Sequence, residues 1–159
     1  MSLHISMQRR VAMVLMLFLG VAIDQYTKYA VYGMEESVIH ITSFFTIKGT
    51  LNPGVSFGMF ADLSSLVLAG VTSAIVLVFV GVWWCEKQPL SAWSYTSVLS
   101  GAVSNIIDRV RIGGVIDFLD FHAAGYHFPT FNVADVLITL GAAGLLIDSL
   151  HFCRKSRKT

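Results

Sequence analysis

Four aspartates lie within or next to long apolar segments of this sequence, namely Asp24, Asp108, Asp117 and Asp135. An ionisable side chain at membrane depth is costly unless it is paired or hydrated, so such residues indicate a functional site. Two carboxylates that share a proton can hydrolyse a peptide, because one takes a proton from water while the other donates to the carbonyl oxygen or the leaving amine. These acids are therefore the first candidates for chemistry.

Asn132 and Asp135 form the sharpest local pattern. Their separation of three places both on one face of a helix, with Thr139 one turn further along. The same spacing is also typical of helix capping, with Asn132 as the N-cap and Asp135 at the third helical position, where the helix dipole favours an acid. The two interpretations can hold together.

The patterns that support other routes to hydrolysis do not occur in the sequence. Serines of the third apolar segment have no Lys or His at helical spacing, which argues against a serine nucleophile. A zinc site is disfavoured because no His-Glu-x-x-His spacing occurs among the five histidines: His4, His40, His122, His127 and His151. We therefore expect no metal and no other cofactor.

Composition places these acids in a membrane protein. Apolar and aromatic residues make up 55% of the chain, charged residues only 13%, and mean hydropathy is +0.68, well above the balance of a soluble domain. The apolar residues occur in runs of the length that crosses a hydrocarbon core. We predict an all-α membrane protein of one domain, residues 1–159, with four transmembrane helices at about 10–32, 62–85, 91–109 and 131–152.

These helices would bring the acids to one depth. At about 1.5 Å per residue, Asp24 lies roughly 20 Å along the first segment and Asp108 roughly 25 Å along the third. Asp135 lies in the first turn of the fourth helix, which runs in the opposite direction. Asp117, in the connecting loop, can reach the same level.

Three further patterns concern packing and the outer surface. Residues 38–42 and 44–47 have strand character and precede a turn at 52–54, which predicts a small β element on the outer membrane surface. Asp117 and Asp120, set among aromatic residues in 116–121, are typical of an amphipathic outer loop. Small residues share one face of the third predicted helix and favour close packing: Ser94, Ser97, Gly101 and Ser104.

Lysine and arginine indicate the orientation. With four spans both termini share one side, and most basic residues lie there, at the N-terminus, at Lys87 and after Phe152. The positive-inside rule then places both termini in the cytoplasm and the acids near the outer leaflet. Net charge is only +1, so no nucleic-acid partner is expected.

Five short blocks of the sequence, in order, resemble the motifs of the lipoprotein signal peptidases, or signal peptidase II. Each block alone is weak, but the full set in a four-span chain of this length is specific. Small-for-small departures occur at Ser56, Ser100 and Ser104. The blocks are DQYTK at 24–28, NPGVSFG at 52–58, NIIDR at 105–109, VIDF at 115–118 and FNVAD at 131–135.

The resemblance implies a bacterial cytoplasmic-membrane aspartic endopeptidase in which Asp117 and Asp135 activate water. Its substrate would be a prolipoprotein, cut just before a diacylglyceryl-modified cysteine, with membrane lipid as the other partner and no oligomer required. The remaining matched positions would have supporting roles: Asn105, Asp108, Arg109 and Asn132 would position the dyad and the loop, Asn52 and Gly54 would border the substrate groove, and Asp24 and Lys28 would form an ion pair that also contacts Asp108 or Arg109.

The residues by themselves leave two other classes open. Buried acids can form the relay of a small proton- or ion-coupled membrane carrier subunit, although the acids here cluster at one depth instead of forming a ladder. A non-catalytic assembly subunit is the third possibility. Which of Asp117 and Asp135 holds the shared proton is also left open, since a coupled pair titrates as a unit.

Overall fold

The computed structural model describes residues 6–32, 38–54 and 64–156. Four helices lie in these ranges: α1 Met7–Val31, α2 Ser65–Cys85, α3 Pro89–Ile112 and α4 Val133–Ser156. They occupy the segments in which the sequence predicts helices. Helix α1, helix α2 and residues Val133–His151 of α4 are long and apolar enough to cross a membrane. The chain is therefore a multi-pass membrane protein.

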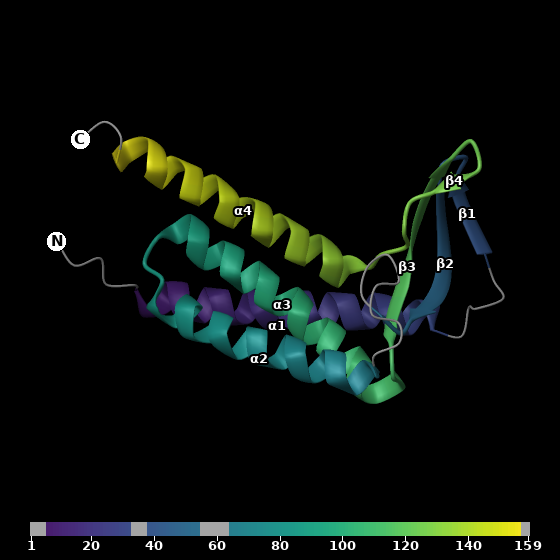
Figure 1. Cartoon of the computed structure of the whole chain (residues 1–159), viewed down its shortest axis with the longest axis horizontal. Helices are drawn as coiled ribbons and strands as arrows, with labels where there is room; N and C mark the ends of the chain where they lie inside the picture. The colour runs from purple at the N-terminus through teal and green to yellow at the C-terminus, as the bar shows by residue number, and fades with distance from the viewer. Residues whose placement is uncertain (1–5, 33–37, 55–63, 157–159) are drawn as a thin grey trace.

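Helix α3 differs from the others because most of its buried side chains are small and polar. It packs against each of the other three helices and lies between α4 and the pair α1 and α2 (Figure 1). A side chain on Gly101 would collide with the carbonyl oxygen of Ala134, and one on Gly141 would lie 2.6 Å from the carbonyl oxygen of Ser94. The expected close packing along the small-residue face of α3 is thus present against α4.

Hydroxyl groups of α3 satisfy their hydrogen bonds on the neighbouring helices. Ser97 Oγ donates to the carbonyl oxygen of Leu137 on α4 at 2.7 Å. Ser100 Oγ donates to the carbonyl oxygen of Leu17 on α1 at 2.9 Å, and Ser104 Oγ to Asp24 Oδ2 at 2.6 Å. Two of the three departures from the motif pattern, Ser100 and Ser104, therefore join α3 to α1. The third, Ser56, lies outside the described residues.

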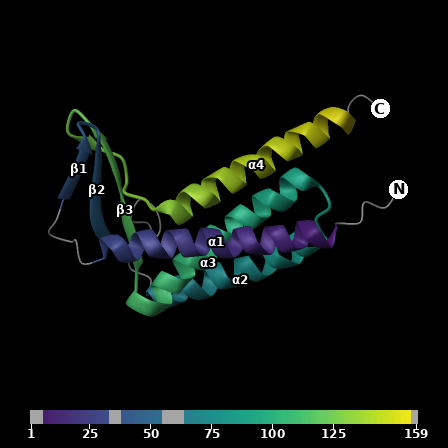
Figure 2. The same cartoon turned by 180° about the vertical axis from the view of Figure 1, so that it is seen from behind.

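The β element is an antiparallel sheet with the order β1-β2-β3-β4. Its strands are β1 Val38–Thr42, β2 Phe45–Asn52, β3 Val115–Ala123 and β4 Tyr126–His127. The strand predicted at 38–42 is confirmed, and β2 continues beyond the predicted 44–47. The sheet lies at one end of the helices, and both chain termini lie at the other (Figures 1 and 2).

The amphipathic outer loop expected at 116–121 is instead part of β3. Its backbone pairs with β2, and the amide groups of Phe118 and Leu119 donate to the carbonyl oxygen of Phe131. Ile116 and Phe118 are buried against Val31 of α1. Pairing on both sides and burial of consecutive side chains on both faces stabilise a strand here, so the small β element includes this segment.

Candidate active site

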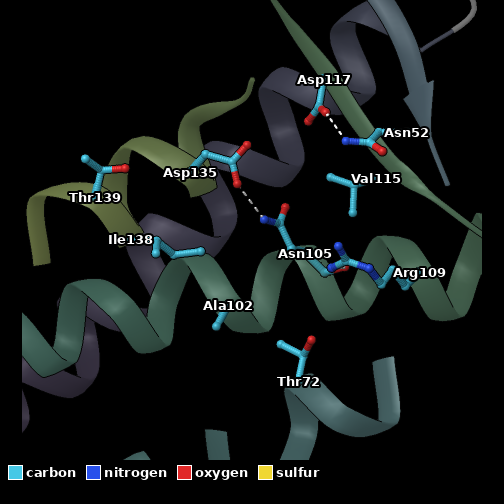
Figure 3. Close-up of a pocket in the computed structure, with 10 residues that line it drawn as sticks. All are labelled: Asn52, Thr72, Ala102, Asn105, Arg109, Val115, Asp117, Asp135, Ile138 and Thr139. Atoms are coloured by element: carbon cyan, nitrogen blue, oxygen red, sulfur yellow. Dashed lines mark hydrogen bonds between the residues drawn. The ribbon is translucent and has the colours of Figure 1, made fainter. Parts of the chain in front are cut away.

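Asp117 and Asp135 line the same cavity, which has a volume of about 300 Å³. Strand β3 supplies Asp117 and the first turn of α4 supplies Asp135, so the sheet and the helices meet at this point. Figure 3 shows both carboxyl groups directed toward the side chains of Asn52 and Asn105. The cavity is lined by Asn52, Thr72, Ala102, Asn105, Arg109, Val115, Asp117, Asp135, Ile138 and Thr139.

Asp117 accepts hydrogen bonds from two asparagine side chains. Asn52 Nδ2 lies 2.9 Å from Asp117 Oδ2, and Asn132 Nδ2 lies 2.7 Å from Asp117 Oδ1. The side-chain oxygen of Asn52 in turn accepts from the backbone amide of Gly54 at 3.0 Å. Each oxygen of this buried carboxyl group therefore has a fixed amide donor.

Asp135 is held by one side chain and by its own helix end. Asn105 Nδ2 donates to Asp135 Oδ1 at 3.0 Å. The backbone amide of Asn132 donates to Asp135 Oδ2 at 3.3 Å, and the backbone amide of Asp135 donates to Asn132 Oδ1 at 2.9 Å. This reciprocal arrangement is a capping box. The capping interpretation of the Asn132–Asp135 spacing is thus confirmed, and it places Asp135 in the cavity at the same time.

The three asparagines share one arrangement. Each side-chain oxygen accepts from a group that can only donate: the Gly54 amide for Asn52, the Asp135 amide for Asn132, and the Lys28 ammonium, at 2.7 Å, for Asn105. Their NH₂ groups must therefore face the carboxyl groups. Such donors favour the ionised carboxylate.

Burial acts against these donors at Asp117. It raises the pKa of Asp117 from 3.8 to about 6; the hydrogen bond from Asn52 lowers it, and the charge of Asp135 raises it further. The hydrogen bond from Asn132 and the charge of Lys28 lower it by smaller amounts. The side chain can thus change its protonation state close to neutral pH, as a general acid or base must.

A buried ion cluster lies directly behind the cavity. Lys28 Nζ is 2.7 Å from Asp24 Oδ2 and 2.8 Å from Asp108 Oδ2, and all three side chains are almost fully buried. The predicted Asp24–Lys28 pair is therefore present, and its further partner is Asp108. Asp24 Oδ1 also accepts from the backbone amide of Ala134 at 2.7 Å. This acid thereby ties the start of α4, which carries Asp135, to α1.

Arg109 connects α3 to the turn after β2. One terminal nitrogen donates to the carbonyl oxygen of Gly54 at 3.2 Å, and the other donates to the carbonyl oxygen of Asn105 at 3.3 Å. Its Nε is buried and has no hydrogen-bond partner among the described residues. The side chain lines the same cavity as the two carboxyl groups.

The structure gathers all ten residues singled out in the sequence around this cavity, in two layers. Five of them line it: Asn52, Asn105, Arg109, Asp117 and Asp135. The other five bond to a lining residue or to the ion cluster: Asp24, Lys28, Gly54, Asp108 and Asn132.

Sequence reasoning missed a smaller set of residues. Thr72 lines the cavity from α2, and its position as a polar residue in an uncharged apolar segment was the available signal. Gln25 donates to Asp108 Oδ1 at 2.7 Å and belongs to the first motif block. Residues 55–58 of the second block lie outside the described residues.

Comparisons with known proteins show the family to which the chain belongs. The family model for Signal peptidase (SPase) II, Peptidase_A8, matches residues 16–151. The chain belongs to the signal peptidase II family. Proteins named lipoprotein signal peptidase from Burkholderia ambifaria and Desulforapulum autotrophicum are both 38% identical to this family member, over 84% and 76% of the chain and 84% and 80% of their own lengths.

Solved structures also resemble this signal peptidase II family member. One is described as a bacterial membrane enzyme determined by the in meso method at 2.3 Å resolution. The two share a TM-score of 0.80 and 27% sequence identity, and the match covers 88% of each chain. The helices and the small sheet are therefore those of a membrane enzyme, and family membership makes the chain a peptidase.

Proposed function

We propose that the chain is a lipoprotein signal peptidase that hydrolyses its substrate with an aspartate dyad, Asp117 and Asp135. The observation that carries the aspartic mechanism is that both carboxyl groups line one cavity and are held there by fixed amide donors. The family name and the names of the relatives support the substrate class.

The proposed reaction needs one proton and one negative charge on the dyad. The ionised carboxylate takes a proton from water, and the water oxygen attacks the scissile carbonyl carbon. The protonated carboxyl group donates to the carbonyl oxygen. When the C–N bond breaks, the proton taken from water passes to the leaving nitrogen, and the proton on the carbonyl oxygen returns to the dyad. The products are the signal-peptide carboxylate and the free amino group of the lipidated cysteine.

Arg109 and the amide donors would favour this reaction by their placement. Arg109 lines the cavity, and its positive charge can stabilise the negative charge that develops on the substrate carbonyl oxygen. Asn52 and Gly54 would border the bound chain at the sheet end. The ion cluster around Lys28 would act indirectly, because Lys28 orients Asn105 and Asn105 holds Asp135.

In this proposal the single domain crosses the bacterial cytoplasmic membrane four times. Helix α3 crosses the membrane in addition to α1, α2 and α4. The hydrogen bonds of its buried polar side chains are satisfied by α1 and α4, so these side chains need not face lipid. Both termini lie in the cytoplasm, and the sheet and the dyad lie near the outer leaflet. A prolipoprotein with a diacylglyceryl-cysteine would meet the dyad at headgroup level.

The first experiment is cleavage of a synthetic diacylglyceryl-modified prolipoprotein by the purified protein in detergent. Asp117→Asn, Asp135→Asn and an unlipidated substrate serve as controls. Cleavage just before the modified cysteine by the wild type, and none in the three controls, is the expected result. Full activity of either folded variant would remove that aspartate from the dyad.

The carrier alternative predicts a different outcome. Proton-dependent flux into liposomes, retained in the peptidase-inactive variants, would favour it. The arrangement of charges gives the carrier alternative little support, because Asp24 and Asp108 both form ion pairs with Lys28.

A further inference from the structure

A second, larger hollow continues the active-site cavity toward the end of the helices that carries the chain termini. Its volume is about 900 Å³. Ile138 of α4 lines both hollows, and Figure 3 shows it beside Asp135. The two hollows are therefore adjacent at this residue.

The residues of α3 in the two hollows form one continuous stripe. They follow each other at intervals of four, three, four, three and four, which is the spacing of one helix face. Those of the larger hollow come first and those of the dyad cavity follow: Ser91, Tyr95 and Val98, then Ala102, Asn105 and Arg109. We call these two adjacent hollows together the trench; α3 forms its floor, and α2 and α4 form its walls.

The trench has apolar walls and ends at two carboxyl groups. Phe79 of α2 and Ala142 and Leu145 of α4 line its middle part. Glu86, in the connection between α2 and α3, and Asp148, on α4, line the end away from the sheet. Such a surface is complementary to an apolar segment that carries positive charge at its far end.

Both carboxyl groups are half-buried. Asp148 Oδ2 accepts a hydrogen bond of 2.5 Å from Ser91 Oγ, and Glu86 Oε1 accepts one of 2.8 Å from the backbone amide of Gln88. Neither forms an ion pair with another described residue. Each retains oxygen lone pairs that can accept from a bound ligand.

The length of the trench matches one part of a signal peptide. Asp135 and Asp148 are thirteen residues apart on α4, which is about 20 Å along a helix. A signal peptide has a basic region followed by an apolar region of about 7–15 residues. A helical apolar region that starts at the dyad would therefore bring the basic region level with Asp148.

We propose that Glu86 and Asp148 bind the basic region of the substrate's signal peptide, while its apolar region lies in the trench. This inference rests on the proposed peptidase function and adds a second recognition site to it. Charge complementarity and continuity with the dyad cavity favour a signal peptide over a lipid acyl chain as the occupant.

The test uses two lipidated substrates that differ only in the basic region, one with two lysines and one with two glutamines there. In a neutral detergent the wild type should cleave the lysine substrate with a kcat/KM about fivefold higher, the effect of a partly exposed ion pair. The Glu86→Gln, Asp148→Asn double variant should cleave both equally, at the wild-type rate for the glutamine substrate. Each single variant should lose part of the preference.

Asp120→Asn is the matched control, because it also removes one carboxyl group but lies on β3 and pairs with His127. It should keep the fivefold preference. A longer substrate, with about six leucines added to the apolar region, should lose the preference in the wild type because its lysines pass beyond the two acids.

The outcomes separate the two proposals. Equal cleavage of both substrates by the wild type, as expected if lipid fills the trench, overturns the recognition site and leaves the peptidase function standing. A preference that persists in the double variant also overturns it. Cleavage of neither substrate by the folded wild type removes the peptidase function and, with it, the recognition site.

Discussion

Two groups of buried aspartates lie side by side in this protein and have different partners. Asp24 and Asp108 contact the ammonium group of Lys28 at 2.7 and 2.8 Å. Among the described residues, the carboxyl groups of Asp117 and Asp135 accept only from amide groups. The first two carboxylates are thus neutralised by a buried cation, whereas the second two face the cavity with neutral donors. The counter-charge therefore separates the structural pair from the chemical one.

Asp135→Asn gives the largest expected effect on activity. It removes an acid–base group but keeps an oxygen that can accept from Asn105, so the peptidase rate should fall at least about a thousandfold. The free energy of unfolding should change by less than about 1 kcal/mol. Cleavage assays and thermal unfolding in detergent measure the two quantities. A large loss of stability would place Asp135 with the structural pair.

Lys28→Met should have its main effect on stability, in contrast to Asp135→Asn. It leaves Asp24 and Asp108 buried without a cation, which should cost about 3–5 kcal/mol of stability. Thermal unfolding in detergent measures the loss. Lys48→Met, at an exposed position on β2, is the matched control and should have little effect. Equal stability of the two variants would contradict the ion cluster as a structural element.

Asn105 links the two groups, because it accepts from Lys28 and donates to Asp135. Asn105→Ala should therefore lower both quantities, stability by about 1–3 kcal/mol and activity by about ten- to a hundredfold through a misplaced Asp135. A variant that lost stability alone would show that Asn105 serves only the ion cluster.

The smallest expected effect concerns pH. An active dyad keeps one proton, so kcat/KM should fall on the alkaline side as the pair loses it, and burial, which raises the pKa of Asp117 to about 6, contributes to the position of this limb. Asn52→Ala removes a donor that lowers this pKa, so the alkaline limb should move to higher pH. A pH profile of both proteins, with Thr130→Ala as a nearby control, tests the shift. An unchanged limb would mean that another group sets it.

Much of the helical architecture could be predicted from local patterns. The runs of apolar residues at α1, α2 and α4 indicate helices because only a helix satisfies the backbone hydrogen bonds of a single segment in lipid. Strand β1 and the start of β2 also followed from local composition. Strand β3 did not, because its aromatic and acidic residues fit an amphipathic segment equally well. Pairing with β2 and contacts with Phe131 decided its structure.

The sequence by itself determined that this is a membrane protein, which acids are candidates for chemistry, and which family it resembles. These conclusions depend on composition and on short motifs, and both are local. Only the tertiary structure decided which partners the acids have. Asp24 and Asp108 form ion pairs with Lys28, whereas Asp117 and Asp135 line one cavity. That division depends on contacts between residues far apart in the chain, such as Lys28 with Asn105, which no local pattern records.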